Sequence, residues 1–192
     1  MANFYEAHFP TPFYVLGQQL KPFSLGHHIL LCRADSGCVR PGQRISFEDF
    51  IFGVLICSRT YEESVKFFLS DWSKELNRWA KRLRKIDLAE AQFVFSSYLI
   101  QGHTRPNFRF LIEQEDFIFG SPWEQRVKVV LMENLGFTES EILNRHLPLC
   151  WWDLLTHDEL KGSIQITEGE TAQFEDEMFK QADEFAATLR KQ

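Results

Sequence analysis

The feature that most constrains this chain is a series of helix-start signals along its length. Each signal is a polar side chain that can accept a hydrogen bond from the unpaired N–H groups of a first helical turn. The signals begin at Ser24, Ser46, Thr60, Asp87, Ser121 and Thr138. Thr60, Asp87 and Thr138 are each followed three residues later by Glu, which completes a capping box. Ser121 is followed by Pro122 at the first helical position and by Glu124 at the third, which makes it the strongest helix-start signal in the chain. The pattern predicts a helix after each signal.

The signals and the apolar spacing together predict an all-α fold, a single compact helical domain of seven to eight helices. Pro10, Pro12 and Pro22 predict that residues 1–22 are not helical. Minor β pieces are expected near the N-terminus and within residues 108–119. The expected helices cover about 24–33, 46–58, 60–85, 87–101, 121–135, 138–145, 149–160 and 170–190.

The domain organisation is predicted to be a helical domain over residues 1–166 and an acidic amphipathic helix over residues 167–192. The second segment holds seven acidic residues against three basic ones. An apolar face on the same segment makes it a mobile or docking arm in this interpretation.

Composition and charge narrow the class of protein. With 192 residues, 44% of them hydrophobic and 25% charged, the chain suits one globular domain. A net charge of −6 argues against a nucleic-acid partner and against an anionic membrane surface as a partner. No apolar run is long enough to span a bilayer, and residues 1–8 do not form a secretory signal. We therefore expect a cytoplasmic protein.

No cofactor, metal site or catalytic residue is expected from the motifs. Four cysteines, Cys32, Cys38, Cys57 and Cys150, form no CxxC pair and are interpreted as reduced, buried thiols. Glycine-rich phosphate loops, GxSxG and HExxH are absent from the sequence.

The histidines are also interpreted as structural. His27 and His28 diverge by about 100° on a helix, which makes a shared metal difficult and favours packed or capping roles. Asp153 and His157, four residues apart on one helix, are expected to form a surface pair.

A basic patch lies at the end of the helix expected over residues 60–85. Six basic residues stand against one acidic residue, Glu75, over residues 74–85. Cations at a helix C-terminus complement the helix dipole, and contact with nucleic acid or an acidic partner is the functional alternative. The patch consists of Lys74, Arg78, Lys81, Arg82, Arg84 and Lys85.

The aromatic content points to protein–protein contact. The chain has 19 Phe and 5 Trp residues, more than one core of this size needs to hold. Adjacent tryptophans on one helix cannot both face one core equally, so one of them is expected near the surface. The candidate partner-binding residues are Trp151, Trp152, Phe174, Met178, Phe179 and Phe185.

Two segments add a resemblance to this interpretation. The first segment, Leu135–Leu149, combines a helix-ending glycine, a capped short helix and a Leu-Pro-Leu sequence that leads into an aromatic helix. The second segment, Leu16–His28, lies near the start of the chain. These segments resemble small helical proteins of phage and prophage tail modules, which are similar to tail assembly chaperones. The resemblance implies a non-enzymatic assembly factor that holds a helical partner such as a tape measure protein. The resemblance implies no catalytic residue in this chain.

The sequence leaves other classes of protein open. A nucleic-acid-associated regulator would use the basic patch, and an enzyme of an unfamiliar helical family would use a pocket near Asp153 and His157. Self-association into a homo-oligomer is a further expectation of the interaction-protein hypothesis. The interaction hypothesis predicts an exposed apolar groove, which the alternatives do not require.

Overall fold

The computed structural model describes residues 4–40, 42–43, 45–83, 88–111 and 120–167. Within these ranges it contains nine helices and two small two-stranded sheets, which confirms the all-α prediction with minor β pieces. The helices are α1 (Phe4–His8), α2 (Leu25–Arg33), α3 (Phe47–Cys57), α4 (Tyr61–Leu69), α5 (Ser73–Arg82), α6 (Leu88–Gly102), α7 (Trp123–Leu135), α8 (Glu139–Asn144) and α9 (Leu147–Leu160).

Four of the predicted helix starts are reproduced in detail, whereas the cap predicted at Ser121 does not form: α7 begins at Trp123, with Pro122 as its N-cap and no side-chain cap hydrogen bond. Ser24, Ser46, Thr60 and Thr138 each accept a hydrogen bond from the backbone N–H three residues later. At Ser24 the third residue is His27, whose Nδ1 accepts from the Ser24 N–H and completes an unusual capping box. Local capping chemistry therefore fixes where these helices begin.

Two predictions about helices were wrong. Residues 4–8 form α1, because Pro10 disfavours helix only at the residue before it and α1 ends at His8. The helix expected over residues 60–85 is two helices, α4 and α5. The break lies at Ser70–Trp72, where the Ser70 hydroxyl donates to the Phe67 carbonyl and Asp71 accepts from the Ser73 N–H. Such side-chain bonds compete with helix continuation.

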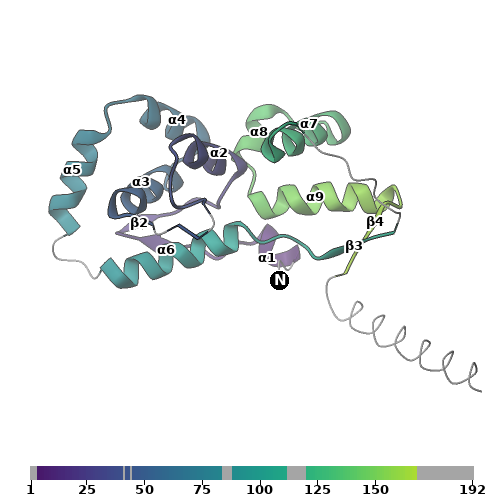
Figure 1. Cartoon of the computed structure of the whole chain (residues 1–192), viewed down its shortest axis with the longest axis horizontal. Coiled ribbons are helices and arrows are strands. Elements are labelled where there is room, and N and C mark those ends of the chain that lie inside the picture. The colour runs from purple at the N-terminus through teal and green to yellow at the C-terminus, as the bar shows by residue number, and fades with distance from the viewer. Residues whose placement is uncertain (1–3, 41, 44, 84–87, 112–119, 168–192) are drawn as a thin grey trace, which may run out of the picture.

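The core lies mainly among α2, α3, α4 and α6, with α7, α8 and α9 beside them (Figure 1). α3 is the central element, and its residues from Phe50 to Cys57 are all buried. Phe95 of α6 is fully buried and its ring lies 5.5 Å from the ring of Phe50. The aromatic-rich composition thus fills this core, as large rings bury much area per residue.

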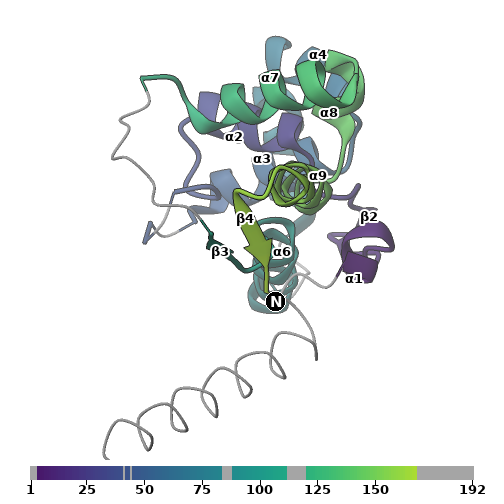
Figure 2. The same cartoon turned by 90° about the vertical axis from the view of Figure 1, so that its right-hand side faces the viewer.

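Each sheet is a short antiparallel ribbon. β1 (Tyr14–Val15) pairs with β2 (Gln18–Gln19) across a tight turn. β3 (Phe108–Phe110) pairs with β4 (Ile164–Ile166), with Phe110 opposite Ile164. This second pairing joins segments far apart in the sequence and places β3 beside β4, which in turn contacts α9 (Figure 2). None of the described helices is both long and apolar enough to cross a bilayer.

Candidate functional site

An apolar pocket of about 340 Å³ lies between α7, α9 and the β3–β4 ribbon. Its deepest residues are Val127, Leu155 and Ile164, each 5% exposed or less. Trp123 and Trp151 form one wall, with their rings stacked at 5.4 Å and an interplanar angle of 19°. The pocket therefore presents an aromatic surface.

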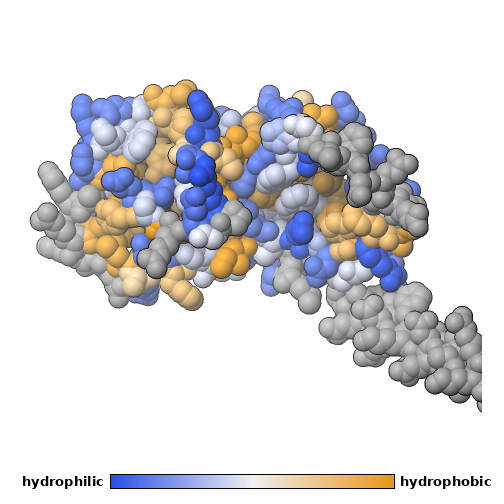
Figure 3. Space-filling model, in the orientation of Figure 1, coloured by the Kyte–Doolittle hydropathy of each residue, from blue (hydrophilic) through white to orange (hydrophobic). Residues whose placement is uncertain are grey.

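The β3–β4 ribbon builds the other wall. Phe108 and Phe110 are two residues apart on a strand, so their side chains share one face, and both line the pocket. Their rings meet edge to face at 5.3 Å. Phe110 is 55% exposed. Figure 3 shows apolar surface in this part of the molecule, beside the end of α9. An exposed aromatic at the mouth of an apolar pocket is typical of a contact site.

Charged side chains lie around this pocket. Arg105, which follows α6, and Arg126 of α7 line it, and so does Asp158 of α9. Arg126 also donates to the Ser121 carbonyl at 2.8 Å, which holds its guanidinium near the start of α7. Two cations beside an apolar pocket favour an occupant that combines an apolar side chain with a carboxylate.

The structure places the six predicted partner-binding residues differently. Trp151 lines the pocket, as the prediction requires. Trp152 is half-buried on another side of α9, where its ring meets that of Phe4 of α1 at 5.3 Å. Phe174, Met178, Phe179 and Phe185 lie outside the described residues, as does the predicted C-terminal arm from residue 168 on, and all of them stay predictions.

The basic patch is only partly described. Lys74 and Arg78 are exposed on α5. The helix includes Lys81 and Arg82, whose side chains are not described, and Arg84 and Lys85 lie outside the described residues. The two described side chains lie on a different element from the pocket, so the described part of the patch does not belong to the pocket.

The pair expected between Asp153 and His157 does not form. Asp153 instead accepts from the Arg145 guanidinium, with Nε and Oδ2 2.6 Å apart. The carboxylate beside His157 is Asp158, 3.5 Å away. Arg145, at the end of α8, offers Asp153 a permanently charged donor, which competes with His157 for this carboxylate. The structure therefore gives no support to an acid–base pair at this position.

His27 and His28 do diverge as expected. His27 is a capping residue whose Nε2–H donates to the Arg59 carbonyl at 2.9 Å, and burial lowers its pKa to about 4. His28 faces the other way, towards Trp123, with 4.9 Å between the ring centres. Cys38, Cys57 and Cys150 are buried as expected, but Cys32, in the last turn of α2, is exposed.

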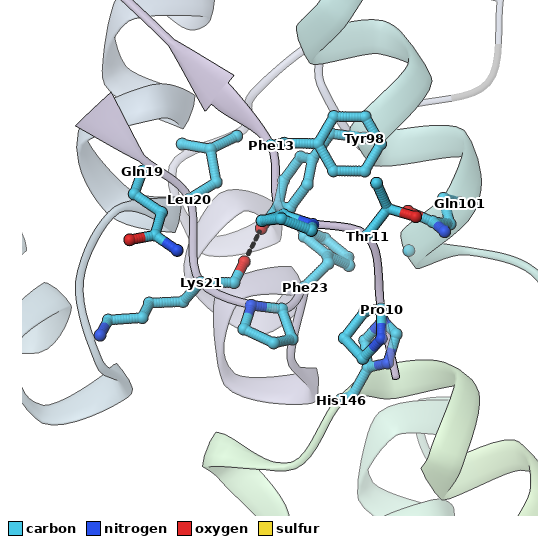
Figure 4. A pocket seen from close by; sticks show the side chains of 13 residues that line it. Pro10, Thr11, Phe13, Gln19, Leu20, Lys21, Phe23, Tyr98, Gln101 and His146 are labelled. Atoms are coloured by element: carbon cyan, nitrogen blue, oxygen red, sulfur yellow. Dashed lines mark hydrogen bonds between the residues drawn. The ribbon is translucent and has the colours of Figure 1, made fainter. Parts of the chain in front are cut away.

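A second, smaller pocket of about 130 Å³ lies under the N-terminal segment (Figure 4). Pro10, Phe13 and Phe23 line it together with Tyr98, whose hydroxyl donates to the Lys21 carbonyl at 2.9 Å. His146 closes one end, and its Nδ1–H donates to the Ala7 carbonyl at 2.9 Å, so this contact ties α1 to the start of α9. The pocket is explained by the docking of the N-terminal segment.

We expect the contact between His146 and Ala7 to make stability fall in mild acid. Burial lowers the pKa of His146, and its hydrogen bond to the Ala7 carbonyl opposes that shift only in part. The unfolded chain then binds the proton more tightly, so the stabilisation is complete above about pH 6.5 and is lost as the pH falls through the lowered folded pKa. Denaturant unfolding at pH 7.5 and pH 5 measures the loss.

The matched variant is His146→Asn, which keeps an N–H donor for the Ala7 carbonyl and does not titrate. The free energy of unfolding of this variant is expected to depend less on pH than that of the wild type. An equal dependence in the two proteins would assign the acid sensitivity to other histidines.

Sequence reasoning found one pocket residue, Trp151, and missed most of the others. The signal at Ser121 predicts a helix that includes Trp123 but no pocket, and Phe108, Phe110 and Arg105 lie in a stretch with weak periodicity. The alternation of Phe108 and Phe110 was the available signal for a one-sided strand.

Comparison with known proteins leaves the site to be interpreted from its own chemistry. No family model matches the sequence. Searches of curated proteins and of solved structures likewise gave no significant match.

Proposed function

We propose that this protein is a cytoplasmic, non-enzymatic interaction protein whose aromatic pocket holds an apolar side chain from a helical segment of a partner protein. The observation that carries the proposal is the pocket between α7, α9 and the β3–β4 ribbon, with its stacked Trp123–Trp151 wall. Amphipathic helices bind by inserting a few apolar anchors into such pockets. Arg105 and Arg126 add a preference for acidic residues beside the anchor.

The mechanism would be sequestration. An apolar helix face of the partner would be covered until assembly and then released. The resemblance to tail assembly chaperones makes a phage-type tape measure protein the first partner to test. The predicted contacts at Phe174, Met178, Phe179 and Phe185 would extend the same apolar surface. A nucleic-acid regulator finds less support, because the described part of the basic patch is limited to two exposed side chains.

The test is a tagged pull-down from cells that produce the protein, after nuclease treatment, with the wild type and matched variants. Phe110→Ala removes an exposed pocket residue and Arg105→Glu reverses a charge beside it. Each is expected to weaken capture of a helix-rich partner by about tenfold or more, because truncated anchors at contact sites cost about 2 kcal/mol. Quantitative mass spectrometry and a binding titration with the recovered partner give the measurement.

The control is Phe93→Ala, which removes a 73% exposed aromatic from α6, away from the pocket. Its capture should equal that of the wild type. Recovery of the bait alone as a monomer, or equal capture by all three variants, would overturn the proposal.

A further inference from the structure

Four side chains with metal-binding chemistry meet beside Trp123, on the side of its ring that faces α2. His28 and Cys32 are four residues apart on α2, so they lie on the same helix face. Glu124 belongs to the first turn of α7, and His103 directly follows α6. The donor atoms of His28, Cys32 and Glu124 all lie within 4.8 Å of one another.

The hydrogen bonds fix how the two histidine rings share their protons. His103 Nδ1 lies 2.8 Å from the Leu99 carbonyl, which can only accept, so this nitrogen carries the hydrogen. The Nε2 of a neutral His103 is therefore an acceptor, and it lies 3.1 Å from Nδ1 of His28. The Nδ1 of His28 must then donate, which leaves the lone pair of a neutral His28 on Nε2.

That lone pair faces two further electron-rich atoms. His28 Nε2 lies 3.2 Å from Oε1 of Glu124 and 3.4 Å from Sγ of Cys32. A nitrogen lone pair and a carboxylate oxygen at this distance repel each other unless a cation lies between them, either a proton or a metal ion. The arrangement is thus a set of three Lewis bases that converge on one point.

The spacing matches the coordination sphere of a small divalent ion. Tetrahedral zinc binds nitrogen and oxygen at about 2.0–2.2 Å and sulfur at about 2.3 Å, which sets ligand atoms about 3.3–3.7 Å apart. The 3.4 Å contact of His28 with Cys32 falls within this range, and the 3.2 Å contact with Glu124 lies just below its lower limit. Mixed N, O and S donors favour zinc and similar transition metals over magnesium or calcium.

We propose that His28, Cys32 and Glu124 form a binding site for a divalent transition metal ion such as zinc. His103 is a positioning residue, since its hydrogen bond orients the His28 ring and leaves Nε2 for the metal. His28 is buried, Glu124 is half-buried and Cys32 is exposed, so the site opens to solvent on the thiol side. A fourth position is therefore accessible to water or to an incoming ligand.

The site borders the aromatic pocket through one residue. The Trp123 ring lies 4.9 Å from that of His28 and stacks on Trp151 inside the pocket. Metal binding that fixes the His28 ring would also fix this wall. The proposal is nevertheless independent of a partner protein, because the ligands all come from this chain.

The test uses the full chain, stripped of metal with a chelator and titrated with Co²⁺ and then with Zn²⁺. We expect one Co²⁺ per chain, a thiolate-to-cobalt charge-transfer band, and displacement of the cobalt by zinc. Cys32→Ser is expected to abolish the band, and Glu124→Gln to weaken binding at least about tenfold while keeping it. His103→Asn should also weaken binding about tenfold and leave the band intact, as a positioning residue would.

Two controls separate this site from adventitious binding. His8→Gln removes an exposed histidine on α1 and should leave the titration unchanged. Circular dichroism of each variant without metal checks that the fold is intact. A cobalt spectrum without a thiolate band, or affinities that Cys32→Ser and Glu124→Gln leave unchanged, would overturn the proposal and leave His28 and Glu124 as a protonated ion pair.

Discussion

Gly26→Ala is expected to lower the free energy of unfolding by about 3 kcal/mol, although the substitution adds only one methyl group. A Cβ at residue 26 would lie 2.5 Å from the Leu143 carbonyl oxygen and 2.4 Å from Cδ2 of Tyr61. The first atom belongs to the backbone of α8 and cannot rotate away. The second belongs to the first residue of α4. The glycine therefore lets α2 approach two helices at once.

The expected loss of stability is opposite in sign to the effect of helix propensity, so the measurement separates the two causes. Alanine is favoured over glycine within a helix by about 1 kcal/mol, so propensity alone would stabilise the variant. A loss seen by denaturant unfolding and far-UV circular dichroism must then come from the clash. Gly120→Ala is the matched control, because nothing lies within 4 Å of its Cβ position, and its effect should stay within about 0.5 kcal/mol. A Gly26→Ala variant as stable as the wild type would show that the helices can separate freely.

Local chemistry explains which parts of the fold could be predicted from the sequence. The caps at Ser24, Ser46, Thr60 and Thr138 act over three residues, and each helix begins where its cap predicts. The break between α4 and α5 was also encoded locally, by the polar residues at Ser70–Ser73, but the continuous apolar stripe outweighed it in the prediction.

The parts that could not be predicted depend on contacts between distant segments. α1 is held by the packing of Phe4 on Trp152 and by the bond from His146 to the Ala7 carbonyl. The pocket needs β3 and β4 to pair across more than 50 residues. No spacing rule in a sequence joins such segments.

The ligands of the proposed metal site could not be predicted from the sequence for the same reason. Zinc motifs are recognised by closely spaced ligands, and only the four-residue interval between His28 and Cys32 has that character. Glu124 comes from a helix 96 residues after His28. The same glutamate that marks a helix start in the sequence supplies the third ligand in the proposed site, so its cap-like position hid its other role.

Phe95→Ala is expected to lower the free energy of unfolding by about 4 kcal/mol, the largest effect of any substitution considered. The Phe95 side chain is 0% exposed, and its ring meets those of Phe50 at 5.5 Å and Tyr98 at 5.8 Å. Truncation removes this buried area and leaves a cavity between α3 and α6. Phe93→Ala on the exposed face of the same helix is the control and should cost less than about 1 kcal/mol.

A double-mutant cycle tests whether this cost reflects the packing of Phe95 against α3. A Cβ at Gly53 would lie 2.8 Å from Cζ of Phe95, so Gly53→Ala alone overpacks the contact. Phe95→Leu alone underpacks it, because it removes the far end of the ring. Combined, the two substitutions should be less destabilising than their sum by about 1 kcal/mol or more, since the new methyl group fills space that the shorter side chain vacates. If the two changes in the free energy of unfolding are strictly additive, the core relaxes around each substitution separately. The packing of the Phe95 ring against Gly53 would then not couple α3 to α6.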